Sequence, residues 1–147
     1  MPILNPYKSE IQFQNAVDSA MAELESIYDI FFDLDHELEE PIKIFKELLK
    51  EKPTKEICYA VAHLLDYFLQ FKQQFGGVKR LITKYNWAIE PYFDKFGRYK
   101  QEEFLIATVV VEEQIAKYEK ILNSQIEKGI PYLKANSYTF NRSLILV

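Results

Sequence analysis

Lysine and arginine are missing from a long part of this sequence. Between Ser9 and Ile42 there are ten aspartates and glutamates and no basic residue. This absence excludes the i,i+4 ion pairs that stabilise most exposed helices. Residues 1–51 contain twelve acids and four bases, whereas residues 52–147 contain ten acids and fourteen bases. The distribution excludes a uniformly basic nucleic-acid-binding protein, but it leaves room for a local basic patch.

Other absences limit the class of protein further. Cys58 is the only cysteine, so an internal disulfide is excluded, and we expect an intracellular, cytoplasmic protein. No apolar run reaches the roughly 18 residues that cross a bilayer, and the first residues lack the apolar centre of a signal peptide, so we expect no membrane partner. The sequence also lacks a phosphate-binding loop, a dinucleotide fingerprint, a nucleophile elbow and a zinc-protease motif. We therefore predict that the chain is not an enzyme.

What the sequence does contain is an apolar repeat in steps of three and four residues. Eight apolar residues between Phe13 and Leu38 share one face of a single long helix. Similar repeats follow, and prolines and glycines separate them as helix starts and stops. The expected helices span about 9–40, 42–51, 53–75, 78–96 and 99–128, with Pro41, Pro53, Gly76-Gly77, Gly97 and Gly129 at their boundaries.

These helices predict an all-α fold. We expect an up-and-down four-helix bundle with a short extra helix over about 42–51, forming one domain over residues 1–130. Residues 131–147 contain no acid and end in four aliphatic residues. Their composition favours an extended C-terminal tail. We expect this tail to pack on the bundle or on a partner, because such an apolar end is poorly suited to water.

A metal or cofactor site is the chemical alternative for a helical bundle. Di-iron bundles use Glu-x-x-His pairs, and this chain offers only Asp33-x-x-His36 and the reversed His63-x-x-Asp66. Both histidines fall between core positions, so we predict no metal ligand and no bound cofactor. Cys58 has no histidine within one helical turn, which indicates a structural thiol. A metal- or cofactor-binding bundle is kept as an alternative function.

The acidic first helix is the leading candidate for a binding surface. Its densest part, Asp33–Glu40, lies at the C-terminal end of the expected helix, where the helix dipole disfavours anions. We predict that this end docks on a protein partner with a basic surface that handles nucleic acid, and that the chain is a regulator or inhibitor. A solvated corner between two helices is the alternative interpretation. The predicted partner-binding residues are Asp29, Asp33, Asp35, Glu37, Glu39 and Glu40.

The expected fourth helix and the residues after it have the opposite charge. Six basic residues are interleaved with aromatic residues there, a pattern that can bind single-stranded nucleic acid. We do not expect this activity, because several of the aromatic residues belong to the core face. We instead expect the positive charges there to balance the negative charges of the first helix, either within one bundle or between two copies. The second functional hypothesis is therefore a self-assembling subunit, for example of a virion or scaffold. This secondary basic patch consists of Lys79, Arg80, Lys84, Lys95, Arg98 and Lys100.

Overall fold

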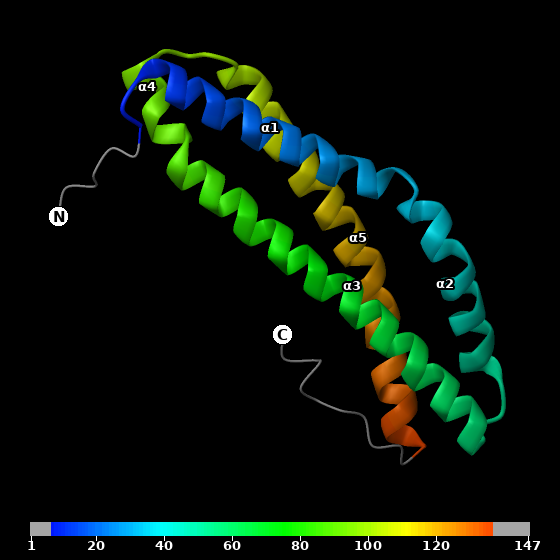
Figure 1. Cartoon of the computed structure of the whole chain (residues 1–147). Helices are drawn as coiled ribbons and strands as arrows, with labels where there is room; N and C mark the ends of the chain where they lie inside the picture. The colour runs from blue at the N-terminus through cyan, green and yellow to red at the C-terminus, as the bar shows by residue number, and fades with distance from the viewer. Residues whose placement is uncertain (1–6, 137–147) are drawn as a thin grey trace. The chain divides into compact units, whose positions relative to one another are not determined.

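The computed structural model of the chain describes residues 7–136. Those residues form helices and turns and no strand, so the all-α prediction is confirmed. The elements are α1 (Glu10–Phe32), α2 (Leu34–Lys50), α3 (Lys55–Ala88), the 3-10 turn η1 (Glu90–Tyr92), α4 (Phe93–Phe96) and α5 (Gln101–Ala135) (Figure 1). None of the helices in residues 7–136 combines the length and the apolar character that a membrane crossing requires.

The helices divide into two compact units, neither of which is contiguous in sequence. Among the described residues, unit 1 consists of 7–31 together with Val78–Gln114. Unit 2 consists of Phe32–Gly77 together with 115–136. Helices α3 and α5 therefore contribute one part to each unit, and each unit has its own core.

The core of unit 1 is a cluster of aromatic rings from α1, α4 and α5. The ring of Phe13 lies 5.3 Å from the ring of Phe93, which lies 5.7 Å from that of Phe104. All three side chains are fully buried. Tyr7 closes the cluster: its ring meets Phe13 edge-on at 5.3 Å, and its hydroxyl donates a hydrogen bond of 2.8 Å to the carbonyl of Ala88. Aromatic pairs of this kind add about 0.5–1.5 kcal/mol each beyond their burial, so the rings hold these helices together.

In unit 2, α2, α3 and α5 meet around Phe45. The side chains of Phe45 and of Leu65 on α3 are fully buried. Gly129 of α5 faces both, since a Cβ atom placed on it would lie 2.7 Å from the Cζ of Phe45 and 3.2 Å from the Cδ1 of Leu65. The missing side chain thus allows α5 to approach the other two helices closely. Gly129, which we expected to end a helix, therefore lies inside α5 and permits its close packing.

The helix expected over residues 9–40 is in fact two helices. Ser9 caps α1, because its hydroxyl accepts the backbone N–H of Gln12 at 3.2 Å. At Asp33 the backbone leaves the helical conformation (φ −100°, ψ 2°), and α2 begins at the next residue. The break starts a new helix just before the densest acids, so Asp35 and Glu37 lie in its first turn. Helix dipoles favour anions there, which gives the break a physical reason.

Pro41 lies inside α2, so the prediction that it ends one helix and opens another is wrong. A proline inside a helix removes one backbone hydrogen bond and costs about 3 kcal/mol. The buried residues Leu34, Leu38 and Phe45 nevertheless form one face that continues across it. Burying three such side chains contributes roughly 5–9 kcal/mol, which outweighs that cost.

The Gly76–Gly77 pair does not end a helix either, because α3 runs through it. Two glycines inside a helix cost about 2 kcal/mol relative to alanine. Phe68, Phe75 and Ile82 are buried at intervals of seven residues on both sides of the pair, so one apolar face continues through it. The expected third helix and the first part of the expected fourth are therefore a single helix, whereas the rest of the expected fourth helix forms η1 and α4. Each unit packs three long helical segments, and the predicted four-helix bundle is wrong in this respect.

Helix α5 also continues beyond its expected end near residue 128, past Gly129 and Pro131 to Ala135. Ile126 and Leu133 are both buried, and their spacing of seven residues keeps the core face continuous through this turn. The extended tail predicted from residue 131 is therefore wrong for Pro131–Ala135. Residues 137–147, which make up the rest of the predicted tail, lie outside the described residues.

Candidate interaction surface

The six predicted partner-binding acids belong to two different units. Asp29 is exposed on α1 of unit 1. The other five are exposed at the helix break and along the first half of α2, in unit 2. We call these five the α2 acidic cluster: Asp33, Asp35, Glu37, Glu39 and Glu40.

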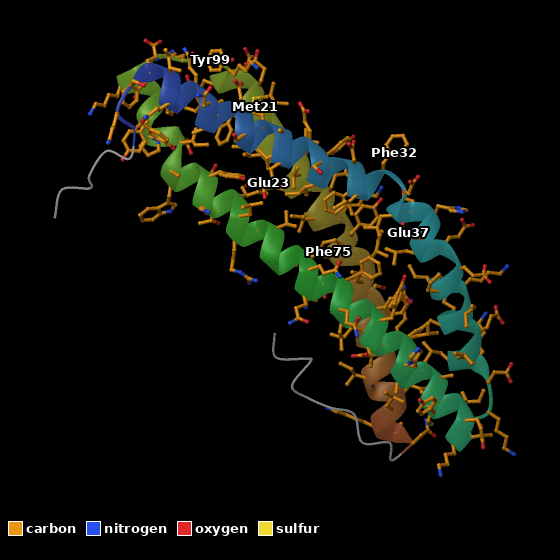
Figure 2. All side chains as sticks on the ribbon, in the orientation of Figure 1. Met21, Glu23, Phe32, Glu37, Phe75 and Tyr99 are labelled. Carbon is orange, nitrogen blue, oxygen red and sulfur yellow. The ribbon has the colours of Figure 1, made fainter. Side chains whose placement is uncertain are left out.

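The position of the α2 acidic cluster removes the conflict that the sequence indicated. These residues lie at the N-terminal end of α2 and not at the C-terminal end of a longer helix. The prediction that a helix dipole disfavours their charges is therefore wrong. An acid in a first turn stabilises its helix by about 0.3–1 kcal/mol. Phe32 directly precedes the cluster, with 80% of its side chain exposed and its ring pointing into solvent, while Glu37 lies further along α2 (Figure 2).

Within the cluster, Asp35 has partners inside unit 2. Its carboxylate accepts a hydrogen bond of 2.8 Å from the hydroxyl of Tyr118 and lies 3.4 Å from the ammonium of Lys117, both on α5. The hydrogen bond from Tyr118, together with the ammonium of Lys117, holds the pKa of Asp35 below its usual value. Burial and the same hydrogen bond raise the pKa of Tyr118 to about 12. Asp35 is therefore an anchor between α2 and α5 as well as a surface acid.

The other four members of the cluster form no ion pair in the described part of the chain. No ion pair or side-chain hydrogen bond of Asp33, Glu37, Glu39 or Glu40 is present within residues 7–136. Their charges are instead exposed side by side over about two turns of α2. Like Glu25 and Asp29 of α1, these four acids belong to the part of the acidic stretch that has no ion-pair partner among residues 7–136.

A groove of about 670 Å³ lies next to the cluster, between α2 and α5 of unit 2. Its apolar lining includes Leu38, Ile42 and Ile121. Asp35 and Glu39 line it near the start of α2, whereas lysines line it one to two turns later. The complete lining is Asp35, His36, Leu38, Glu39, Ile42, Lys43, Lys46, Tyr118 and Ile121. The groove therefore has an acidic end and a basic end, and it can take an apolar side chain between them.

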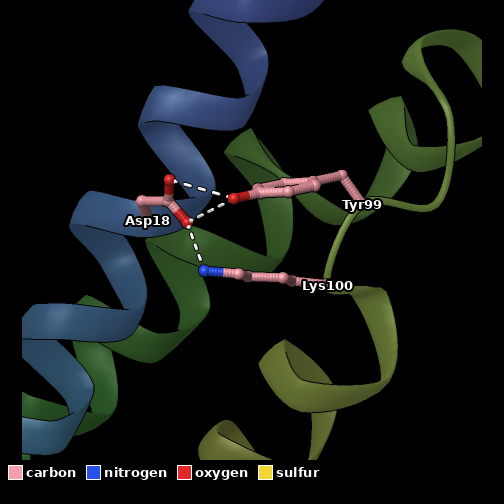
Figure 3. Close-up of polar contacts among 3 residues, drawn as sticks. All are labelled: Asp18, Tyr99 and Lys100. Atoms are coloured by element: carbon pink, nitrogen blue, oxygen red, sulfur yellow. Dashed lines mark hydrogen bonds and ion pairs between the residues drawn. The ribbon is translucent and has the colours of Figure 1, made fainter.

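Within unit 1, two acids of α1 have hydrogen-bond or ion-pair partners on other segments. Asp18 lies 3.0 Å from the ammonium of Lys100 and accepts hydrogen bonds of 3.2 Å from the hydroxyl of Tyr99 (Figure 3). The hydrogen bond with Asp18 raises the pKa of Lys100. Glu23, on the side of α1 that faces α3, accepts a hydrogen bond from the hydroxyl of Tyr85 (Figure 2). Burial and this hydrogen bond raise the pKa of Tyr85.

The secondary basic patch is spread over three elements of unit 1. Lys79, Arg80 and Lys84 lie on α3, Lys95 lies on α4, and Arg98 and Lys100 lie between α4 and α5. The side chain of Trp87 is 74% exposed, but the neighbouring Tyr92 and Phe96 pack with Tyr7 in the aromatic cluster. Of the interleaved aromatic residues, Trp87 is thus the most accessible large ring.

The histidines and the cysteine are dispersed. His36 and His63 are exposed on α2 and α3, and Cys58 is buried on α3 with a reduced thiol. Over residues 7–136, no group of three His, Cys, Asp or Glu side chains has an arrangement that could hold a metal ion.

Sequence reasoning missed Tyr118 as the main partner of Asp35. The two residues are 83 positions apart, and Tyr118 fits the apolar face of its own helix, so no local pattern marks its hydroxyl. The groove between α2 and α5 was missed for the same reason, since its lining comes from two distant segments.

The chain matches no protein-family model, no curated protein and no solved structure. The geometry of these surfaces is therefore the basis on which a function can be inferred.

Proposed function

We propose that this chain is a non-enzymatic interaction protein, a regulator or inhibitor, that docks the α2 acidic cluster on the basic surface of a protein partner. The partner surface that fits best is one that normally holds nucleic acid, because spaced carboxylates on a helix present negative charge to it as phosphates do. We place this action in the cytoplasm, in keeping with a single cysteine that forms no disulfide.

The observation that carries this proposal is the set of exposed, uncompensated carboxylates. Unit 1 neutralises Asp18 with Lys100, and unit 2 neutralises Asp35 with Lys117. Similar compensation is absent for Asp33, Glu37, Glu39 and Glu40 across the described residues. Like charges on successive turns repel one another, so they lower the stability of an isolated helix. Cations on a basic partner would offset this repulsion by pairing with the carboxylates.

The neighbouring groove and Phe32 support the same surface. Complementary charge mainly speeds encounter and selects partners, whereas buried apolar contacts slow dissociation. The groove can receive an apolar side chain of the partner beside Glu39, and the exposed ring of Phe32 can contact the partner at the other end of the cluster. A bound partner is thus expected to present a basic stretch next to an apolar residue.

The experiment compares capture of partners by the wild-type chain and by a variant with Asp33→Asn, Glu37→Gln, Glu39→Gln and Glu40→Gln. Asp35 is left unchanged because it anchors α2 to α5. Immobilised protein is exposed to lysate of cells that naturally express the chain, and the captured protein is then purified for kinetic measurements. We expect the association rate of that protein to fall about 10- to 100-fold at low salt in the variant, and its salt dependence to weaken.

The matched control neutralises four other exposed acids of unit 2, with Glu47→Gln, Glu51→Gln, Glu56→Gln and Glu127→Gln. It has the same net charge as the test variant and is expected to bind as the wild type does. Equal binding by the wild type and the test variant, with the same salt dependence, would refute the proposal.

A further inference from the structure

Helix α5 contains an apolar run that is only partly covered. Phe104–Val111, in which the buried Thr108 is the one polar residue, is bracketed by the acid pairs Glu102–Glu103 and Glu112–Glu113. A helix segment that is apolar on all sides is normally buried on all sides. Here the side chain of Ile106 is 55% exposed and that of Val109 is 48% exposed. An apolar surface framed by acids therefore remains open on unit 1.

Beside this run, α1 and α5 enclose an apolar groove of about 330 Å³ within unit 1. Its walls are mostly apolar and include Tyr28 and Val110. Glu25 and Asp29 are its charged lining residues, and both are exposed. Neither forms an ion pair with any residue that the structure describes. Its volume is near the lower end of the ~300–1,000 Å³ typical of pockets for organic groups, so we call it the acid-framed groove.

A surface with the complementary properties lies on α3 of the same unit. Arg80, Lys84 and Trp87 follow one another at spacings of four and three residues, which places them on one side of the helix. That side faces away from the buried Ile82. Trp87 is 74% exposed, and neither Arg80 nor Lys84 forms an ion pair with an acid in residues 7–136. We call these three residues the basic-aromatic strip.

We propose that the acid-framed groove of one copy of this chain binds the basic-aromatic strip of a second copy. The indole of Trp87 enters the apolar groove, and the cations of Arg80 and Lys84 meet the carboxylates of Glu25 and Asp29. Tryptophan and arginine are the residues that most often dominate binding energy at protein interfaces. Pairing of groove with groove is disfavoured, because it would bring like charges together.

The contact is heterologous, since the two surfaces come from different helices of unit 1. Repeated use of such a contact builds a ring or an open chain of copies and not a closed two-fold dimer. It does not involve the α2 acidic cluster, so this inference is independent of the proposed function. The variant that neutralises four acids of α2 is expected to self-associate as the wild type does.

The first test is sedimentation equilibrium of the purified full chain over about 5–500 μM in 50 mM salt. We expect concentration-dependent association that weakens about tenfold in 500 mM salt. Trp87→Ala is expected to weaken it by at least about tenfold, because the groove loses its main apolar ligand. A monomer at every concentration would overturn the proposal, and that result would also fit a groove that serves a foreign protein.

The decisive test exchanges the charges. Arg80→Glu with Lys84→Glu, and separately Glu25→Lys with Asp29→Lys, should each abolish self-association. Mixing these two variants, or combining all four changes in one chain, should restore it, because opposite charges face each other again. Restoration also shows that the variants are folded, and circular dichroism checks their helix content directly.

The control is Lys120→Glu with Lys128→Glu, which lowers the net charge as much as Arg80→Glu with Lys84→Glu does, at two exposed positions of unit 2. This control should associate nearly as the wild type does. Failure of the mixed variants to associate, or association that persists in both separate variants, would overturn the assignment of these surfaces.

Discussion

Replacing both Gly76 and Gly77 by alanine tests the continuity of α3. The structure has an uninterrupted helix through this pair, whereas the sequence pattern favours a turn between two helices. The two arrangements predict effects of opposite sign. In a helix, alanine is the better residue, because glycine leaves the unfolded chain with more conformational freedom to lose.

The expected gain follows from the helix propensities of the two residues. Each Gly→Ala change inside a helix contributes about 0.8–1.0 kcal/mol, so the double variant should be more stable by roughly 2 kcal/mol. For a chain of this size, that corresponds to an increase in Tm of about 4–8 °C. Thermal unfolding followed by circular dichroism at 222 nm measures it, and a urea titration gives the free energy of unfolding.

Gly129→Ala is the matched control, since it makes the same chemical change in another helix. Its new Cβ would lie 2.7 Å from the Cζ of Phe45, so neighbouring side chains must move. Overpacking of this kind costs about 1–3 kcal/mol and cancels or exceeds the gain in helix propensity. We expect its Tm to be unchanged or lower. A lower Tm for the Gly76→Ala, Gly77→Ala variant would refute a continuous α3.

Three further changes test individual contacts. Tyr118→Phe removes the hydroxyl that donates to Asp35 and should cost about 0.5–1.5 kcal/mol in a urea titration; an unchanged midpoint would contradict this contact. Because that hydrogen bond lowers the pKa of Asp35, its stabilisation is complete above the unfolded pKa of roughly 4 and disappears as the pH falls through the lower folded value. The difference in unfolding free energy between wild type and Tyr118→Phe should therefore narrow on titration from about pH 6 to pH 2. Pro41→Ala should raise the unfolding free energy by about 1–3 kcal/mol if α2 is continuous, whereas a decrease would mean that Pro41 begins a helix. Asp18→Asn should cost less than about 1 kcal/mol, since its partner Lys100 is 44% exposed, and a larger loss of stability would show that this pair is more than a surface contact.

The apolar faces of the helices were predictable from sequence. Phe13, Val17 and Leu24 are buried on α1, and Phe104, Val111 and Ile115 are buried on α5, at the spacings expected. These faces are fixed by the helical period alone, and a one-residue shift would expose large apolar side chains. The all-α class follows from the same periodicity.

Helix boundaries were less predictable, because tertiary packing outweighs local preference. Pro41, Gly76-Gly77 and Gly129 are each unfavourable inside a helix by about 1–3 kcal/mol. Burial of the apolar residues on both sides offsets these costs, and Gly129 is also required for the close approach of Phe45. The seven-residue interval between Phe75 and Ile82 is the signal in the sequence that indicates one helix across the glycine pair.

The candidate surface was predictable only in composition. The acidic stretch is plain in the sequence, but its division between two helices depends on the backbone conformation of Asp33. Lys100, the partner of Asp18, is 82 residues away in the sequence, and Tyr118, the partner of Asp35, is 83 residues away. A local sequence pattern cannot reveal pairs at such distances. The same distance hides both grooves, each of which is built by two segments far apart in the chain.

The discontiguous units have a consequence for synthesis of the protein. The α1 segment of unit 1 ends at Phe31, and the next segment of that unit begins only at Val78. At about 5–20 residues per second, a ribosome needs roughly 2–9 s to make the chain between these two segments. During that time the segment that packs against α1 in unit 1 has not yet been made. Its apolar face is then accessible to other nascent chains. Ten acids without a single base between Ser9 and Ile42 give these segments mutual repulsion. The one-signed charge thus opposes contact between the acidic segments of two chains while the rest of the core is being made.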